Sequence, residues 1–504
     1  MMRRLFIVCL CALLAACGRA PAVDTLESDL SAGLALAYGD NAFAITELQR
    51  MGSATDSTAP DGIERKVVYF DAALTLRQPM QLGAWDQPSV ASLVTLLGAG
   101  SRGVTGVLSG GNQAGDVILA HGSAIYQKTP QGWEWVAPAG VTPAEAPSLD
   151  AGGHTTVVNN LLDSLSQITR SVARDGSETS RRIVQQELQR SVARIDGRLS
   201  RMQQGYPIAG GPQGGEYAAF TRALADIKRP DPFRLTPLAT AGGRENIDLL
   251  RQGGAVLALA QGDTARQAYE GKGPFASDGP FAGLRALGSL YPELVHVVVR
   301  AGETWPDVRA LKGRKIALGP EGSAVRSTLL RVLEAHGLQA GRDYTAVDLP
   351  FADALSQVTR GQVDAAVHVI GVPATPLRDA LTQGRLRLLA LDAQAVQALA
   401  AADDAFMPLP IAAGSYPRQT APVMSVGAAA LLLTTIDLTR NEAIEVVRFV
   451  YRSGNDLLAN GSAQAAQISV QNARRGVTVP LHDGAEEALL GLEEKMQAAG
   501  AAKP

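Results

Sequence analysis

Cysteine is nearly absent from this 504-residue chain, which has only Cys9, Cys11 and Cys17, all close to the N-terminus. If the first two leave with an export leader, only Cys17 remains, and that excludes a disulfide and a thiolate metal site. A large charge of one sign is also missing, since 46 basic residues face 49 acidic ones and the formal net charge is -3. Nothing in this balance indicates nucleic acid as a partner.

The motifs of common enzyme chemistries are missing as well. The sequence contains no GxxxxGK[ST] phosphate loop, no HExxH, no GxSxG and no CxxC. The stretch 108–113 resembles the signature of ABC ATPases, but without a phosphate loop it is interpreted as a glycine-rich turn. His296 and His368 lie in apolar runs, where a core histidine is expected more often than a catalytic one. We therefore expect no catalysis and no cofactor.

The first eighteen residues predict export. Arg3 and Arg4 precede an apolar run over 5–14, and Leu14-Ala15-Ala16-Cys17-Gly18 resembles the lipobox of bacterial lipoproteins. We expect a signal peptide over residues 1–16 and acylation of Cys17, which would anchor the chain to a lipid bilayer without spanning it. Gly18, in place of Asp, favours the outer over the inner membrane. The alternative is an ordinary secretory signal with an incidental cysteine.

Composition and pattern divide the exported chain into three parts. With 46% hydrophobic and 19% charged residues the chain is typical of folded proteins, and its length allows about three domains. Residues 17–150 are predicted to form a small α+β domain of unknown role, with a helix over 26–37 and strands around 67–70, 124–126 and 133–136.

Residues 151–204 have helical spacing and predict a connector. Apolar residues follow a 4-3-4 step over 161–172 and resume over 184–202, after Gly176. A dimerising coiled coil is the alternative interpretation. Two short runs broken at a glycine favour packing against the neighbouring domains instead.

From residue 205 the pattern becomes α/β. Apolar runs over 255–260, 316–318, 365–370 and 428–433 alternate with amphipathic helices over 323–336 and 352–359. Such runs are typical of parallel strands covered on both faces by helices. About 300 residues exceed one comfortable layer, so we expect two lobes in residues 205–504.

Two glycine-rich segments stand where ligands of parallel α/β sheets bind. Residues 210–217 precede a helix, and residues 319–324 lie between a strand and a helix. Glycine lets backbone N–H groups approach a ligand, and a helix N-terminus favours an anion. Each segment taken alone is more often just a tight turn.

Here the sequence resembles the TAXI solute receptors, the extracytoplasmic subunits of one branch of TRAP transporters. The resemblance covers about 206–490, and its motifs are Gly214-Gly215-Glu216-Tyr217, Gly242-Gly243-Arg244-Glu245-Asn246, Leu259-Ala260-Gln261-Gly262-Asp263, Leu290-Tyr291-Pro292-Glu293, Leu311-Lys312-Gly313-Arg314-Lys315, Leu318-Gly319-Pro320-Glu321-Gly322-Ser323, Ala413-Gly414-Ser415-Tyr416-Pro417 and Val479-Pro480-Leu481-His482. It implies a two-lobed periplasmic-binding-protein type II fold, with lobe one at about 205–300 and 423–495 and lobe two at about 301–422.

The resemblance also implies a set of ligand-binding residues. They are Gly214, Gly215, Tyr217, Asn246, Gln261, Asp263, Gly322, Ser323, Gly371 and Tyr416. The chain departs from the family where Gly243 and Gly262 replace common serines, Val325 a threonine and Arg266 an aromatic residue.

One further residue follows from the helix after Ser323. Arg326 lies three residues into it, so its guanidinium is a candidate to hold a ligand carboxylate through two parallel hydrogen bonds. The alternative is a solvent-facing or inter-lobe arginine. Glu216 and Asp263 form a possible acid/base pair, although an acid at a helix N-terminus is sufficient explanation for Glu216.

Together these observations predict a lipid-anchored receptor on the periplasmic face of a bacterial membrane. The expected solute is a small anion, either a carboxylate or an amino acid such as glutamate or 2-oxoglutarate, and the expected partners are TRAP-type membrane permease subunits. Two alternatives remain, a periplasmic sensor or scaffold and a hydrolase.

Overall fold

The computed structural model describes residues 21–138, 195–227 and 233–501, with short gaps at 57–58, 60–61, 88, 100–102, 109–110, 131, 196, 202 and 460–462. The predicted signal peptide, Cys17 and most of the predicted connector lie outside the described residues. Those residues between 195 and 204 that are described are largely helical, and Arg201 forms a bidentate ion pair with Glu442, with N–O distances of 2.8 and 2.9 Å.

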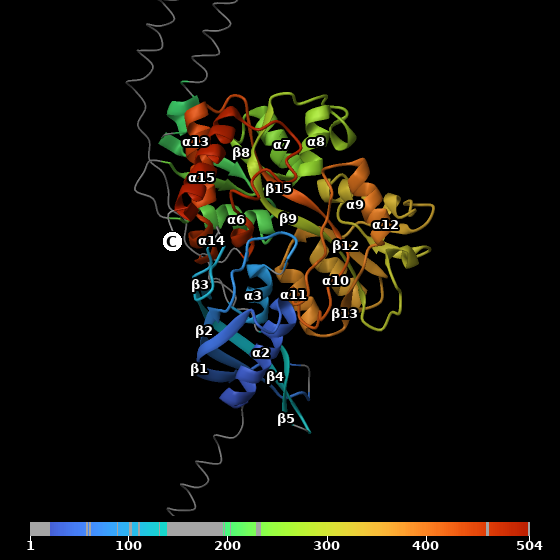
Figure 1. Cartoon of the computed structure of the whole chain (residues 1–504). Helices are drawn as coiled ribbons and strands as arrows, with labels where there is room; N and C mark the ends of the chain where they lie inside the picture. The colour runs from blue at the N-terminus through green and yellow to red at the C-terminus, as the bar shows by residue number, and fades with distance from the viewer. Residues whose placement is uncertain are drawn as a thin grey trace, which may run out of the picture.

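The N-terminal residues form an antiparallel sheet with two helices (Figure 1). The strands run in the order β1-β2-β4-β3, with β5 paired to β4. In sequence order the elements are α2 (Val23–Tyr38), β1 (Phe43–Thr55), β2 (Arg65–Leu76), α3 (Val90–Leu96), β3 (Val104–Thr105), β4 (Val117–Thr129) and β5 (Gly132–Pro138). Leu26, Leu30 and Leu34 recur every four residues, which puts them on one buried face of α2.

Lobe one is built on five strands in the order β7-β6-β8-β15-β9. Its strands are β6 (Tyr206–Ala209), β7 (Leu235–Leu238), β8 (Leu257–Gln261), the first half of β9 (Leu284–Arg300) and most of β15 (Val426–Thr435). Its helices are α6 (Glu216–Ala225), α7 (Gly243–Gln252), α8 (Gly262–Glu270), α13 (Arg440–Arg452), α14 (Gly454–Ala459) and α15 (Asp483–Ala501), with the short turns η2 (Gly273–Phe275) and η4 (Ala463–Gln467).

Lobe two repeats this plan with the order β11-β10-β12-β9-β13. Its strands are β10 (Lys315–Ala317), β11 (Thr345–Val347), β12 (Ala365–Gly371), β13 (Leu386–Leu389) and the second half of β9. The short β14 (Met407–Pro408) pairs with the start of β15. Its helices are α9 (Ala324–Ala335), α10 (Phe351–Thr359), α11 (Thr375–Thr382) and α12 (Ala393–Ala402), with the turn η3 (Val308–Leu311).

The two lobes share one plan and are joined by crossing strands. In each lobe three strands are parallel, and an antiparallel strand follows them in the order. Residues 284–294 of β9 pair with β15, and residues 293–299 pair with β12, so the crossing falls inside β9 rather than near residue 300. The predicted two-lobed α/β fold is confirmed. The sheets differ from the parallel ones expected, because the crossing strands run antiparallel.

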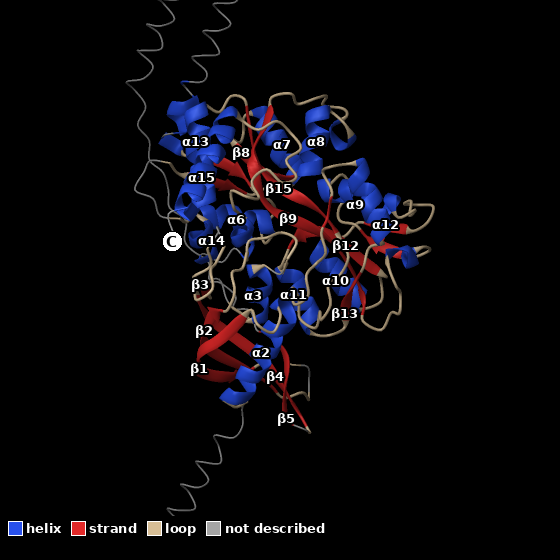
Figure 2. Cartoon of the chain, in the orientation of Figure 1, coloured by secondary structure: helices blue, strands red, loops and turns tan. Residues whose placement is uncertain are grey.

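Helices cover both faces of each sheet (Figure 2), which explains the continuous apolar runs. Four clusters of buried apolar side chains result, two in each lobe. One lobe-one cluster continues into the N-terminal domain, from Leu259 and Phe449 to Leu26 and Phe70. The N-terminal domain and lobe one therefore share a core.

Candidate functional site

Glu293 lies where β9 passes from one lobe to the other. Its backbone is opposite Gly371 of β12 and Ala428 of β15. The residue is only 4% exposed, and Tyr217 donates a hydrogen bond of 2.6 Å to its Oε2. Gln261, at the end of β8, also bonds to this carboxyl group. Among the described residues no Lys, Arg or His forms an ion pair with it.

The pKa of Glu293 is raised to about 8, chiefly by burial. The hydrogen bonds from Tyr217 and Gln261 oppose this rise, and the nearby charges of Asp263 and Glu216 contribute to it. At neutral pH the carboxyl group is therefore largely protonated. Burial, and then the charge of Glu293, also hold the pKa of Tyr217 well above its usual value, so this hydroxyl remains a donor.

Asp263 opens α8 and is 1% exposed. Its Oδ2 accepts a 2.6 Å hydrogen bond from Thr328 of α9, in the other lobe, and lies 3.7 Å from the guanidinium of Arg331. Within the part of the chain that is described, Oδ1 of Asp263 and Oγ1 of Thr264 are buried without a hydrogen-bond partner. Burial raises the pKa of Asp263. Asp263 thus joins the two lobes through Oδ2, while its Oδ1 is left unsatisfied among the described residues.

Glu216, the first residue of α6, also reaches the other lobe. Its carboxyl group accepts from the backbone N–H of Thr375, at the start of α11, and lies 3.4 Å from Nε2 of Gln464. The same Gln464 nitrogen donates to the carbonyl oxygen of Pro373 at 3.2 Å. Burial raises the pKa of Glu216 to about 7. Glu216 therefore contacts the N-terminus of a helix in lobe two, beyond its own helix.

A chain of ion pairs joins the lobes farther along α8. Arg266 donates a 2.8 Å hydrogen bond to Asp403, at the end of α12, and also contacts Asp404. Arg331 of α9 contacts Asp403 from the side of lobe two. Arg266, which stands where the resemblance implies an aromatic residue, thus acts as a closing contact between the lobes.

Two residues from the predicted site are satisfied inside one lobe. Asn246 is fully buried, donates to the carbonyl oxygens of Gly210 and Leu259, and accepts from Thr240 at 2.5 Å. Its role here is to tie together the ends of neighbouring strands. Because none of its hydrogen-bonding capacity points elsewhere, Asn246 supports the site without facing a solute.

Tyr416 is likewise held inside lobe two. Its hydroxyl accepts from the backbone N–H of Ala374 at 3.0 Å and lies 2.8 Å from Nε2 of His296. His296 Nδ1 bonds to the carbonyl oxygen of Leu294, so Nε2 is the acceptor of the Tyr416 proton. Burial lowers the pKa of His296 to about 3 and that of His368 to about 4, which keeps both rings neutral.

The glycine loops have similar backbone conformations in the two lobes. Gly214 and Gly322 have φ values of 83° and 75°, in the left-handed region that favours glycine. Gly215 and Ser323 are the residues that precede α6 and α9, and Ser323 caps α9 by accepting from the N–H of Arg326. Gly371 lies against Gln464 and Tyr291, so a side chain there would press on both.

Arg326 does not take the position expected for a carboxylate clamp. Its guanidinium pairs with Asp348 and donates to the carbonyl oxygen of Gly319 at 3.2 Å, both in lobe two. Position 262 leaves no room for the serine that the resemblance implies, because a Cβ added at Gly262 would lie 2.8 Å from the carbonyl oxygen of Gly476. The absence of a side chain at Gly262 therefore goes with close packing of the backbone against Gly476.

Sequence reasoning missed three residues that complete the contact, Thr328 and Arg331 in α9 of lobe two and Gln464 in η4 of lobe one. Nothing in their local pattern separates them from other helical polar residues. Glu293 had a usable signal, since an acid within an apolar strand is rarely buried without a role. It appeared only as the last letter of the motif 290–293.

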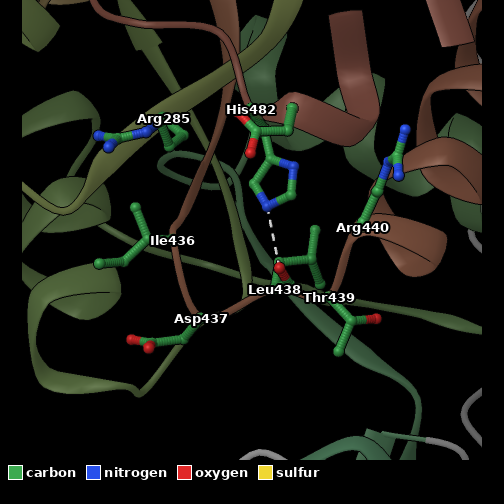
Figure 3. A pocket seen from close by; sticks show the side chains of 8 residues that line it. Arg285, Ile436, Asp437, Leu438, Thr439, Arg440 and His482 are labelled. Carbon is green, nitrogen blue, oxygen red and sulfur yellow. Dashed lines mark hydrogen bonds between the residues drawn. The ribbon is translucent and has the colours of Figure 1, made fainter. Parts of the chain in front are cut away.

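A separate pocket of about 320 Å³ lies on lobe one, at the starts of α13 and α15 (Figure 3). Its lining residues are Arg285, Ile436, Asp437, Leu438, Thr439, Arg440, His482 and Asp483. His482 Nε2 donates to the carbonyl oxygen of Leu438, and Nδ1 accepts from the N–H of Gly484. Both ring nitrogens are thus used in holding the two helix starts together.

Two features are absent from the described residues. They contain no group of three or more His, Cys, Asp or Glu residues placed to hold a metal ion. In this part of the chain no helix has both the length and the apolar character needed to cross a membrane.

The topology and the contacts between lobes define the class: a two-lobed solute-binding fold of the periplasmic type, with two strands crossing between the lobes. The chain belongs to the NMT1-like family, whose model matches residues 208–489. This match starts after the N-terminal domain and covers both lobes.

Several solved structures are similar to the chain at low identity. The periplasmic aliphatic sulphonate binding protein SsuA from Escherichia coli is 17% identical over 57% of this chain and 78% of its own, with a TM-score of 0.34. The alkanesulfonate-binding protein SsuA from Xanthomonas axonopodis pv. citri, bound to MOPS, is 22% identical over 58% and 90%, with a TM-score of 0.31.

Proposed function

We propose that this chain is a lipid-anchored receptor, exposed on the periplasmic side of a bacterial membrane, that captures a small solute between its lobes and delivers it to a TRAP-type permease. No chemical step is part of this proposal. The observation that carries it is the crossing of β9 and β15 between two lobes of the same plan, with Glu293 at the crossing. Two crossing strands permit the lobes to open and close around a solute.

The contacts between the lobes support this function. Thr328–Asp263, Glu216–Thr375 and Arg266–Asp403 are all polar and all join one lobe to the other. Polar contacts exchange for water at small net cost, whereas apolar ones would resist opening. The lobes are therefore joined in a way that suits repeated opening and closing.

The residues at the crossing also bear on the solute. A small carboxylate or an amino acid was expected, and Arg326 was the candidate for its carboxylate. Because Arg326 is paired with Asp348, while Glu293 and Asp263 lie between the lobes, an amino acid fits better than an oxo acid. Its ammonium group supplies the charge that these acids lack.

Native mass spectrometry of the purified, undigested protein tests this function. We expect a co-purified small molecule whose mass is lost when the protein is unfolded and refolded. Adding the identified molecule back should restore the heavier species. If the protein carries no molecule and binds none from a periplasmic extract, the receptor function is wrong.

Anchoring through Cys17 is tested separately. Replacing Cys17 with Ser removes the thiol that is acylated, so the protein should move from the membrane fraction to the soluble periplasmic fraction. Cys9→Ser, within the predicted signal peptide, is the control and should leave the distribution unchanged. Membrane association of Cys17→Ser equal to that of the parent would contradict the anchor.

A second function, a periplasmic sensor, is favoured by the position of the N-terminal domain. Trp85 Nε1 donates to the carbonyl oxygen of Gln467 at 3.2 Å, and Asn472 Nδ2 donates to that of Gly83 at 2.8 Å. On the other side, the hydroxyl oxygens of Ser92 and Ser415 lie 3.4 Å apart. The domain therefore contacts both lobe one and lobe two.

Hydrogen exchange separates a sensor from a passive extension. In a sensor, amides of residues 82–97 should change protection when the solute binds, because closing the lobes moves both of their contacts. A passive extension should show changes only in residues 205–495.

A further inference from the structure

We propose that Glu293 receives the positively charged amine of the solute, and that solute binding displaces a proton from this carboxyl group. The inference rests on the proposed receptor function and names the charge that its solute carries. Four observations support it: the place of Glu293, the unsatisfied acceptor beside it, the commitment of the nearby arginines and the charges that surround it.

The first observation is the place of Glu293 in a continuous hydrogen-bonded network. Tyr217 and Gln261 bond to Glu293, Thr328 lies 3.4 Å from Gln261 Oε1, and the same hydroxyl donates to Asp263 at 2.6 Å. The network starts in lobe one and continues into α9 of lobe two. A solute held between the lobes would have to meet it.

The second observation is that one acceptor in this network is unused. Asp263 is 1% exposed, and its Oδ1 has no hydrogen-bond partner among the described residues. The adjacent Thr264 hydroxyl is also buried and unpartnered in that part of the chain. A buried carboxylate oxygen left unpaired costs about 1–3 kcal/mol, more when it is charged, and a donor such as an ammonium group removes this cost.

The third observation is that the nearby arginines are already committed. Arg331 contacts both Asp263 and Asp403, and Arg326 pairs with Asp348. Arg378 lies near Glu216 and 3.5 Å from Asp379. None of the three is left to neutralise Glu293, and none is left to hold the second charge of a dianion.

The fourth observation is the set of charges around Glu293. α6 contributes Glu216 and Tyr217, β8 contributes Gln261, α8 contributes Asp263 and β9 itself contributes Tyr291. The partners in β12 and β15, Gly371 and Ala428, have no charge. Acids therefore surround Glu293, and burial together with their charges raises its pKa to about 8.

The proton balance follows from this environment. Before binding, Glu293 is protonated, and the solute arrives as an ammonium ion. In the complex a carboxylate faces the ammonium, because opposite charges at contact favour the ionised form, and the carboxyl proton passes to solvent. Affinity should rise with pH up to about 8 and fall again as the free amine loses its proton near pH 10, the range of aliphatic amines.

The experiment begins with a panel of probes on the full mature chain carrying Cys17→Ser. Thermal shift compares the twenty common L-amino acids and putrescine with 2-oxoglutarate, glutarate and ethanesulfonate. The best amine is then titrated at pH 6.5 by calorimetry in phosphate and in bis-Tris, two buffers that hold this pH and whose different ionisation enthalpies reveal proton release. We expect stabilisation by an amine and release of nearly one proton per site.

Glu293→Gln keeps the shape and the acceptor for Tyr217 but removes the ionisable group. It should bind the amine at least 30-fold more weakly and release no proton. Glu334→Gln, which changes an exposed acid on α9, is the matched control and should behave as the parent.

The outcomes separate this inference from the receptor function. If only oxo acids or the sulfonate stabilise the chain, it is a receptor but the amine proposal is overturned. If amines bind without proton release, or equally well to Glu293→Gln, Glu293 is not their partner. If no probe binds and no solute co-purifies, both proposals fail.

Discussion

The two lobes place a glycine loop and a helix after their first strand, yet use them in opposite ways. In lobe one, β6 leads through 210–215 to Glu216 and Tyr217, which both contact groups outside their own helix. In lobe two, β10 leads through 319–323 to α9, where Arg326 turns back to Asp348. The same backbone plan therefore places acidic and polar side chains toward other elements in lobe one. In lobe two the charged side chain of Arg326 is paired within its own lobe.

This difference divides charge between the lobes. Lobe one and the crossing strand supply Glu216, Asp263 and Glu293, while lobe two supplies Thr328, Arg331 and the start of α11. Lobe two provides hydrogen-bond donors to two of these acids, Asp263 and Glu216. Glu293 has no cation beside it in the described chain. Among the described residues, Arg266 of lobe one reverses this polarity, because it reaches Asp403 of lobe two. The comparison favours Glu293, rather than the glycine loops, as the centre of the proposed site.

Replacing Glu293, the acid without a cation beside it, should have the largest effect on stability. The pKa of Glu293 is about 8 in the folded chain against 4.5 for a free side chain, so between these values the folded state holds a proton that the unfolded state has lost. The free energy of unfolding therefore falls as pH rises, by about 1.4 kcal/mol per pH unit. Glu216 adds the same sign up to about pH 7. Urea unfolding at pH 5, 6, 7 and 8 should show that the free energy of unfolding declines less steeply with pH in Glu293→Gln than in the parent. Equal slopes would contradict the raised pKa of Glu293.

Asn246 ties together the ends of strands in lobe one, and replacing it should have the second-largest effect on stability. Asn246→Ala leaves the carbonyl oxygens of Gly210 and Leu259 and the Thr240 hydroxyl without their buried partner. We expect a loss of roughly 3 kcal/mol in unfolding free energy, the scale of a broken buried polar network. Asn455→Ala, at an exposed helical position, should change it by less than about 0.5 kcal/mol. Similar small changes in both variants would contradict the role of Asn246 in holding the strand ends together.

Weakening the contact between Arg266 and Asp403 should have a smaller effect. It should act on the closure of the two lobes. Asp403 joins Arg266 of lobe one to Arg331 of lobe two, so Asp403→Asn weakens both contacts. These groups are partly exposed and screened, so we expect about 1 kcal/mol in favour of the open state. Small-angle X-ray scattering should report a larger radius of gyration. Asp404→Asn, whose exposed side chain contacts only Arg266, is the control; equal effects of the two would argue against a shared Asp403.

The smallest effect should come from Arg326. Because its guanidinium is paired within lobe two, Arg326→Lys should change solute affinity less than twofold and stability by less than about 1 kcal/mol. Calorimetric titration with the co-purified solute measures the affinity. A tenfold loss with the fold intact would return this arginine to the binding site.

Much of the fold could be predicted because local signals agree with it. The apolar runs became β8, β12 and β15, and Ser323 marked the start of α9 as a capping residue does. The crossing of β9 could not be predicted, since Pro292 and Glu293 interrupt the apolar pattern inside one continuous strand. Partners across lobes, such as Asp263 and Thr328, are 65 residues apart and are fixed only by tertiary packing.

The site was predictable to a similar extent. Tyr217, Gln261 and Asp263 do lie together at the contact between the lobes. Asn246 and Tyr416 lie near it but are used inside their own lobes, which a sequence cannot show because hydrogen-bond partners depend on side-chain direction. The phase of Arg326 in the first turn of α9 is equally invisible to periodicity.

One distance measurement tests the central claim, that two lobes close on a solute. Spin labels at Gln252→Cys in α7 and Glu334→Cys in α9 lie at exposed positions, and replacing Cys9, Cys11 and Cys17 with Ser leaves them the only thiols of the 504-residue sequence. Pulsed electron paramagnetic resonance should give a broad or longer distance for the refolded, solute-free protein, and a single shorter one after the co-purified solute is returned. An identical distribution in both states, with the solute bound, would contradict closure of the lobes as the mechanism.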